Sequence, residues 1–144
     1  MSIAAQCVKT LIQEMVLDHK DYIALNQLLE QQRKMIIAAS PDIAPLNQQI
    51  IEIYQRLAQR SRHRYRLMSQ LGIPVCSHGL QALFSRLPAA QQSRLNALWD
   101  DLQNRAAQCK VINDYNGTLL NMQREIWENV VNSSVPENWL YREK

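Results

Sequence analysis

The side chains that most often perform catalysis or bind metals are scattered along this chain of 144 residues. Its three histidines lie far apart in the sequence, and Cys76-x-His78 has no second ligand pair at the spacing of a zinc site. Asp18 and Asp21 fit a solvated helix face better than an acid–base pair. No glycine-rich phosphate loop, HExxH or Gly-x-Ser-x-Gly motif occurs. The sequence therefore predicts a protein that is not an enzyme and that uses no metal ion or cofactor.

Positive charge is concentrated in the middle of the chain, although the net charge is only +3. Residues 53–99 contain seven arginines and no acidic residue. By contrast, residues 1–52 contain four basic and six acidic residues, and residues 100–144 contain five basic and seven acidic residues. The middle of the chain is therefore a basic segment between two mildly acidic arms.

The densest basic stretch is RLAQRSRHRYR, which we expect to be helical. At about 100° per residue, Arg56, Arg60 and Arg64 drift along one side of such a helix, while Arg62 and Arg66 project to another side. Charge that wraps around a helix fits an anchor for acidic partners, or a solvated bundle end, better than a track for phosphates. A basic bundle that binds nucleic acid remains an alternative.

The overall composition favours helices in a reducing compartment. Hydrophobic residues make up 47% of the chain, whereas glycine occurs three times and phenylalanine once, which is poor material for a β-sandwich. No apolar run approaches the roughly 18 residues that a membrane span needs, and the N-terminus lacks the pattern of a secretion signal. Three cysteines without framework spacing suggest free thiols. We therefore expect a cytoplasmic protein with no membrane insertion.

Apolar residues recur every seven positions near the N-terminus, a spacing typical of coiled-coil-like helix packing. These residues are Val8, Met15, Tyr22, Leu29 and Ile36. The pattern and its breaks at proline and glycine predict an all-α fold, an elongated antiparallel bundle of three long helices and one short helix. Gly72 is the expected C-cap of the second long helix. The expected helices span about residues 3–39, 45–71, 80–87 and 88–132, which make residues 1–132 one bundle and 133–144 an extended or flexible tail.

The dipeptide Asn116-Gly117 raises the question of whether the chain turns here, because Asn-Gly is a strong signal for a tight hairpin. A hairpin requires alternating apolar residues on both sides, and VIND and TLLN do not alternate. A single heptad register instead continues through the dipeptide and is interrupted only by Arg105. Its apolar members are Leu98, Ile112, Leu119 and Ile126. The sequence therefore predicts a continuous helix with Gly117 inside it.

Beyond residue 118, apolar residues occupy more faces of this helix than one bundle seam can use. They are Leu119, Leu120, Met122, Ile126, Trp127, Val130 and Val131. The surplus indicates an exposed face for a partner helix. Two alternatives remain open: the short segment at about 80–87 covers this face, or a structural coiled-coil protein uses it to form a homodimer.

The order of these features resembles the FlgN-like flagellar export chaperones. A long N-terminal helix and an Arg-rich helix that ends in LMSQLGIP are followed by GLQALFSRLP, LNALWDDL and CKVINDYNGTLL. Asn113, Asn116 and Gly117 match the Asn-x-x-Asn-Gly pattern of the family's last long helix. The resemblance covers most of the chain.

The resemblance implies a cytoplasmic, non-enzymatic chaperone for the hook-associated proteins of the hook–filament junction. Such a chaperone binds the C-terminal helical regions of these proteins, prevents their premature assembly and delivers them to the type III export gate. It implies a monomer or weak homodimer with no nucleic-acid partner. Substrate binding belongs to the last long helix, and the residues expected to contribute are Ile112, Asn116, Gly117, Leu119, Leu120, Gln123, Ile126, Trp127 and Val130.

The resemblance also implies a role for the C-terminal tail, which carries the cluster Trp139, Leu140 and Tyr141. In the family, a Leu-Tyr-Gly segment of the tail docks on the cytosolic domain of the export gate. Leu140 and Tyr141 match its first two positions, and Arg142 stands in place of the glycine. Leu140 and Tyr141 are therefore the expected gate-docking residues.

Overall fold

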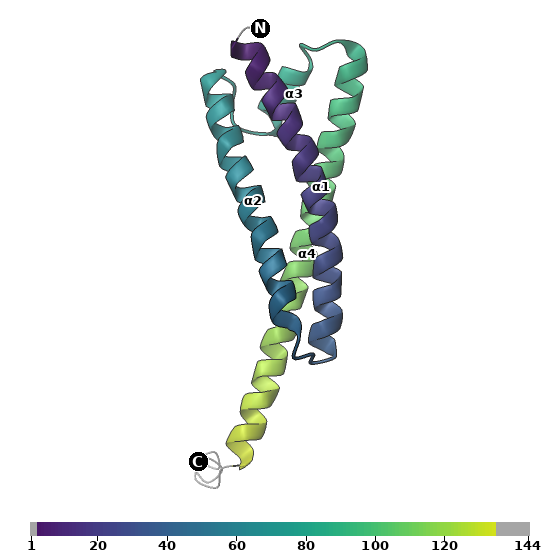
Figure 1. The fold of residues 1–144 in the computed structure, drawn as a ribbon, viewed down its shortest axis with the longest axis vertical. Coiled ribbons are helices and arrows are strands. Elements are labelled where there is room, and N and C mark those ends of the chain that lie inside the picture. Colours follow the sequence, from purple (N-terminus) through teal and green to yellow (C-terminus); the bar gives the residue numbers. More distant parts are fainter. Residues whose placement is uncertain (1–2, 135–144) are drawn as a thin grey trace.

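The computed structural model describes residues 3–134, and helices account for most of them. In chain order they are α1 (Ile3–Ile37), α2 (Ile43–Gln70), α3 (Ser77–Phe84) and α4 (Ala89–Ser134). No strand occurs in this described part of the chain. Three long helices lie side by side in an elongated bundle, with the short α3 at one end (Figure 1). The predicted all-α fold is confirmed.

The connection between α1 and α2 is a tight turn that satisfies the last carbonyls of α1. Ala39 adopts a left-handed conformation with φ of 51°. Its N–H donates to the carbonyl of Ile36 at 3.0 Å, and the N–H of Ser40 donates to Met35 at 2.9 Å, which is the Schellman pattern. Pro45 lies in the first turn of α2, where a missing N–H costs nothing. α1 ends at Ile37 and α2 begins at Ile43, each two residues before its predicted position.

The end of α2 is confirmed at the predicted glycine. Gly72 has φ of +67°, its N–H donates to Ser69 at 3.1 Å, and the N–H of Ile73 donates to Met68 at 3.0 Å. These two bonds satisfy carbonyls that a helix end otherwise leaves unpaired.

The short helix begins and ends earlier than the predicted range of 80–87. A Cβ at Gly79 would lie 2.0 Å from the carbonyl oxygen of Pro74, so the absent side chain lets the linker pack directly on the first turns of α3. The helix can therefore begin at Ser77. After Phe84 the chain forms turns, with Leu87 N–H donating to Phe84 at 3.0 Å, before α4 begins.

α1 is the central helix of the bundle. It packs against both α2 and α4, whereas no Cα of α2 lies within 8 Å of a Cα of α4. α1 and α4 run in the same direction and α2 runs in the opposite direction (Figure 1). The backbone of α3 approaches only that of α4 among the helices, with Cα atoms within 8 Å, while its buried side chains also join the core shared with α1 and α2.

Two clusters of buried side chains form the core. The first joins the N-terminal half of α1, the end of α2, α3 and the start of α4, and it is built around Leu11, Met15, Met68, Phe84 and Leu102. The second joins the rest of α1 to the first half of α2 and to Cys109 of α4. The two clusters hold the three long helices together along the length of α1.

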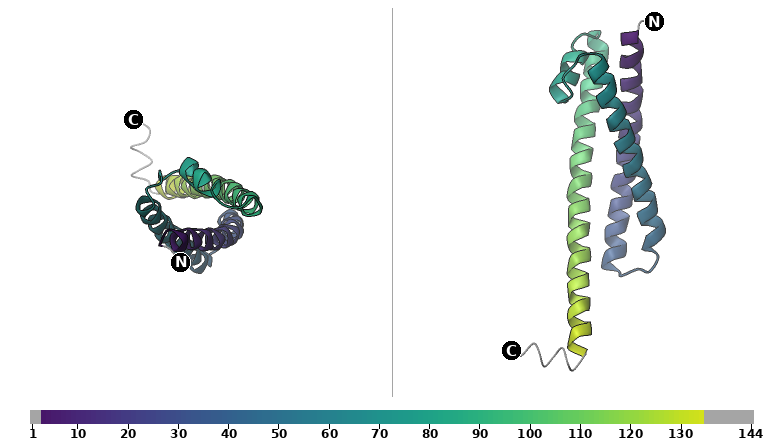
Figure 2. Two further views of the ribbon diagram at one scale, coloured as in Figure 1. Left: turned by 90° about the horizontal axis from the view of Figure 1, so that it is seen from above. Right: turned by 90° about the vertical axis from the view of Figure 1, so that its left-hand side faces the viewer.

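The helix α4 runs straight through Gly117, as predicted. It also continues beyond the α1–α2 turn, so its last turns project from the bundle (Figures 1 and 2). The helix reaches Ser134, two residues further than the predicted end, so residues 133 and 134 are helical rather than part of a tail.

Candidate partner-binding site on the last helix

Three contacts at seven-residue intervals attach α4 to α1. In each, a side chain of α4 approaches a backbone carbonyl of α1, and the sequence separation is 87 every time. The contacts are Cys109 Sγ with Tyr22 O at 3.7 Å, Asn116 Nδ2 with Leu29 O at 2.9 Å, and Gln123 Nε2 with Ile36 O at 2.6 Å. The constant separation fixes the parallel register of the two helices.

This register corrects the predicted seam of α4. The heptad of α1 is confirmed, but it faces Leu95, Leu102, Cys109 and Asn116, all of which are buried. The predicted seam through Leu98 lies three positions away on the helix and is only partly buried or, at Ile126, 61% exposed. The pattern of apolar residues could not identify this seam, because two of the seam positions are an asparagine and a glutamine.

Asn116 extends its contact into a chain of hydrogen bonds across three helices. Its Nδ2 also donates to Oε1 of Gln32 at 2.9 Å, and Nε2 of Gln32 donates to Oδ1 of Asn47 on α2 at 2.7 Å. Asn116 is 1% exposed, so its side chain serves the bundle rather than facing a partner. The chain therefore makes a fixed base from which the last turns of α4 emerge.

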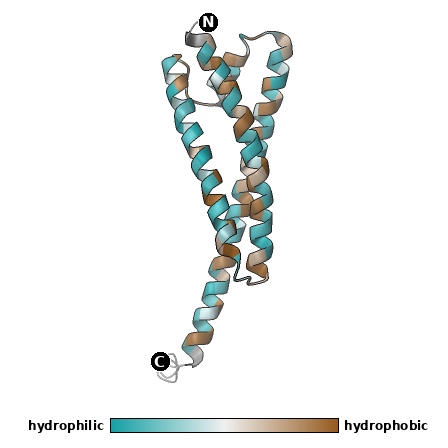
Figure 3. Ribbon diagram, viewed as in Figure 1, coloured by the Kyte–Doolittle hydropathy of each residue, from teal (hydrophilic) through white to brown (hydrophobic). Residues whose placement is uncertain are grey.

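Beyond this base, the apolar residues of α4 lie on the surface of the single chain. Ile126, Trp127 and Val130 are 61%, 68% and 57% exposed, and Leu120 is 46% exposed. Leu119 and Ile112 are partly buried at the edge of the bundle. Figure 3 shows hydrophobic residues in this projecting part of the helix.

These residues share one half of the helix surface, which we call the α4 face. At about 100° per residue, they cover roughly 180° of the circumference. Its members are Leu119, Leu120, Met122, Ile126, Trp127, Val130 and Val131. The opposite half carries Arg124, Glu125 and Glu128. An amphipathic helix with its apolar half exposed has the character of a binding surface for another apolar helix.

The short helix does not cover the α4 face. Leu80, Leu83 and Phe84 of α3 belong to the core cluster that includes Leu95 and Leu102, near the start of α4. Figure 1 shows α3 at the end of the bundle opposite to the projecting turns. The alternative in which the segment at about 80–87 buries the surplus apolar residues is therefore excluded.

Three arginines of α2 form ion pairs with two aspartates of α1. Arg60 Nε donates to Asp18 Oδ1 at 2.5 Å and Arg64 also pairs with Asp18, while Arg56 Nη2 lies 3.1 Å from Asp21 Oδ1. Asp18 is 4% exposed, so the prediction of a solvated face for the two aspartates was wrong. Aspartates at i and i+3 on α1 face arginines at i and i+4 on α2, a spacing that could have revealed the pairing.

The arginines of α2 keep the carboxyl group of Asp21 ionised. Burial alone would raise its pKa, but hydrogen bonds and charge from Arg56 and Arg60 outweigh that effect, so the pKa of Asp21 is lowered from 3.8. The carboxylate therefore remains charged at neutral pH and links α1 to α2.

Comparison with known protein families decides how these surfaces are interpreted. The family model described as FlgN protein matches residues 1–136. The chain belongs to the FlgN family. This family consists of chaperones for flagellar type III export, as the resemblance implied. Searches of curated proteins and of solved structures gave no match.

Within residues 3–134, no group of three or more His, Cys, Asp or Glu side chains could hold a metal ion. None of the helices in that range is long and apolar enough to cross a bilayer.

Most of the residues predicted to bind a substrate of this FlgN-family chain lie on or beside the α4 face. Gly117 is partly exposed, and a Cβ built on it would meet no atom within 4 Å. Gln123 is exposed but bonds to α1, and Asn116 is buried. The predicted gate-docking residues Leu140 and Tyr141 lie outside the described residues.

Proposed function

We propose that this FlgN-family chaperone binds the C-terminal helical regions of flagellar hook-associated proteins on the α4 face. The observation that carries the proposal is an apolar half-helix that extends beyond its own bundle, with Ile126, Trp127 and Val130 more than half exposed. A substrate helix would cover these residues and would itself be kept from premature assembly in the cytosol. No nucleotide is needed, because the apolar surface alone drives binding.

Burial of the exposed side chains of the α4 face releases enough free energy to hold a substrate helix. Full burial of a Val, Leu, Ile or Met side chain contributes about 1.5–3 kcal/mol, before the cost of ordering the two partners. Several such side chains are exposed together on the α4 face. Micromolar binding requires about 8 kcal/mol of net free energy, so a few well-buried anchors suffice.

The test is binding of the C-terminal region of a hook-associated protein to the full chain and to a variant with Leu120→Ser and Val130→Ser. We expect binding to weaken by roughly tenfold or more, with the far-UV circular dichroism nearly unchanged. Glu125→Gln with Glu128→Gln, on the polar half of the same turns, is the matched control and should bind like the parent. Unchanged binding of the serine variant would contradict the proposal, and loss of its helical signal would assign both residues to the core.

A homodimer through the α4 face would use the same exposed residues, and light scattering separates the two functions. A chaperone with a free face should remain a monomer, or dimerise weakly, over the concentrations at which it binds the substrate. A stable dimer that the serine substitutions dissociate, and that does not bind the hook-associated region, would favour the structural alternative.

We further propose that Leu140 and Tyr141 dock the loaded chaperone on the cytosolic domain of the export gate. The support is the match to the family's Leu-Tyr pair and the clustering of Trp139, Leu140 and Tyr141 in the sequence. An aromatic anchor commonly contributes 2 kcal/mol or more, so Tyr141→Ala should weaken gate binding by roughly thirtyfold. Substrate binding should not change. Equal gate binding by parent and variant would contradict the docking role.

A further inference from the structure

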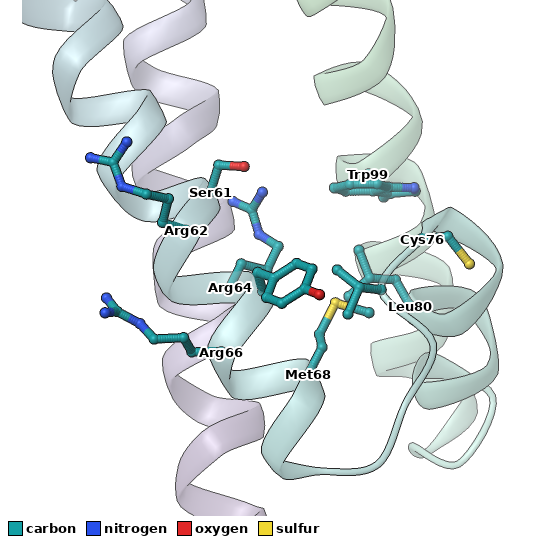
Figure 4. A pocket seen from close by; sticks show the side chains of 10 residues that line it. Ser61, Arg62, Arg64, Arg66, Met68, Cys76, Leu80 and Trp99 are labelled. Carbon is teal, nitrogen blue, oxygen red and sulfur yellow. The ribbon is translucent and has the colours of Figure 1, made fainter.

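A second surface lies at the end of the bundle opposite to the projecting turns of α4. Residues of α2, of α3, of α4 and of the segment between α2 and α3 line a groove with a volume of about 610 Å³ (Figure 4). We call it the α2–α4 groove. Trp99 on α4 and Leu120 are 21 positions apart, which corresponds to about 32 Å along the helix. The groove and the α4 face are therefore separate surfaces.

The groove has an apolar lining with an exposed aromatic wall. Met68 and Leu80, which are 1% and 2% exposed, close its base. Tyr65 is 59% exposed, Val75 is 42% exposed, and both border the same space together with Trp99. Figure 4 shows Met68 and Leu80 close together below the Trp99 side chain. Pockets of a few hundred Å³ with aromatic walls are typical of binding sites.

The arrangement of the helices explains why this space is open. α2 and α4 each pack closely on α1, whereas no Cα of α2 lies within 8 Å of a Cα of α4, and α3 is only eight residues long. A four-helix bundle would place a full-length helix between α2 and α4 on the side away from α1. In this chain that position is filled only in part, so an added helix would complete the bundle.

The charged side chains that line the groove are all positive. Its ten lining residues include three arginines and no carboxylate. Arg64 is paired with Asp18, whereas Arg62 and Arg66 are exposed and form no ion pair with any described residue. They are four positions apart, so they lie on the same flank of α2, at the rim of the groove, and Figure 4 shows both side chains pointing away from Trp99. A partner with carboxylates beside its apolar anchors would match this flank.

Residues 135–144 of the same molecule cannot supply the partner. Trp99 and the end of α4 at Ser134 are separated by 35 positions, or about 52 Å of helix. Ten extended residues span at most about 35 Å. A segment that fills the groove would therefore come from another molecule.

We propose that the α2–α4 groove binds an acidic amphipathic helix of a partner protein. The apolar side of that helix packs on Tyr65, Val75 and Trp99, and its carboxylates pair with Arg62 and Arg66. This site is additional to the α4 face, so the chaperone can hold a substrate helix and a second acidic helix at once. The proposal does not depend on the identity of the substrate that the α4 face binds.

The probe is a labelled peptide of about five helical turns with leucines at i, i+4, i+7 and i+11 and glutamates beside them. Its matched partner carries lysines in place of the glutamates. Fluorescence anisotropy with the full chain should show saturable binding of the acidic peptide and binding of the lysine peptide that is at least roughly tenfold weaker. Equal binding of both peptides, or of neither, overturns the proposal.

Two variants locate the site. Arg62→Glu with Arg66→Glu should weaken binding of the acidic peptide by roughly tenfold or more, whereas Lys9→Glu with Lys20→Glu on α1, which changes the net charge equally, should leave it within about twofold. Tyr65→Asp should also abolish binding, and it tests the groove if the arginine variant does not fold. Loss of binding in both charge variants would show a general charge effect and overturn the proposal.

Three further results would assign the surfaces differently. If Ile126→Asp with Val130→Asp abolishes peptide binding, the peptide occupies the α4 face and the proposal is wrong, whereas retained binding supports a separate site. If duplex DNA binds in a manner lost with Arg62→Glu and Arg66→Glu, and the peptide does not bind, the groove is a nucleic-acid site. A dimer that Tyr65→Asp dissociates would identify a second copy of this chain as the occupant.

Discussion

Gly117→Ala should stabilise this protein, although Asn116-Gly117 has the sequence of a turn. Gly117 lies inside α4, where glycine costs about 1 kcal/mol relative to alanine. A Cβ at this position would meet no atom within 4 Å, so no steric penalty offsets the gain. For a chain of this size, 1 kcal/mol corresponds to a rise in melting temperature of about 2–4 °C.

The assay is thermal and urea unfolding followed by circular dichroism. Ala97→Gly, at an exposed position of the same helix, is the reciprocal control and should lower the free energy of unfolding by a similar amount. A clear fall in the melting temperature of Gly117→Ala would refute the continuous helix. Because the space beside Gly117 is empty in the single chain, a substrate helix that approaches it closely would bind Gly117→Ala more weakly. Stability and substrate affinity would then change in opposite directions.

Four other changes test the packing of the bundle. Ala39→Gly should stabilise by up to about 1 kcal/mol in urea unfolding, because Ala39 holds a left-handed conformation that glycine adopts without strain. Asp18→Asn should destabilise by about 2–3 kcal/mol, less than for a fully buried pair because Asp21 remains beside the arginines. Because the pKa of Asp21 is lowered from 3.8, its stabilisation is complete above about pH 5 and is lost progressively as the pH falls through 3.8 and below, so the parent should lose more stability than Asp21→Asn between about pH 7 and pH 3. A thiol reagent should modify exposed Cys76 at once and Cys109 only on unfolding, because burial raises the pKa of Cys109 and blocks access to it.

The fold followed from local signals that act over a few residues. The heptad from Val8 to Ile36 marks the buried side of α1, and Gly72 ends α2 because it tolerates a positive φ. The range predicted for the short helix, 80–87, begins and ends three residues later than α3. The contact between Gly79 and Pro74 that allows its early start depends on the path of the linker, which no periodicity describes.

The candidate site was predictable in part. The exposed residues of the α4 face follow from counting apolar side chains against one seam, but their exposure depends on how far α4 extends beyond α1 and α2. The true seam was missed because Asn116 and Gln123 bond to carbonyls rather than packing as hydrophobic residues. The α2–α4 groove could not be predicted, since it depends on the distance between the backbones of α2 and α4, which no sequence pattern describes.

The central claim is that a substrate helix covers the α4 face, and hydrogen–deuterium exchange tests it most directly. Exchange would be measured on the full chain, alone and saturated with the C-terminal helical region of a hook-associated protein. We predict the largest gain in protection in residues 119–132, with little change in α2. Strong protection confined to the bundle, with exchange in residues 119–132 unchanged, would contradict the account.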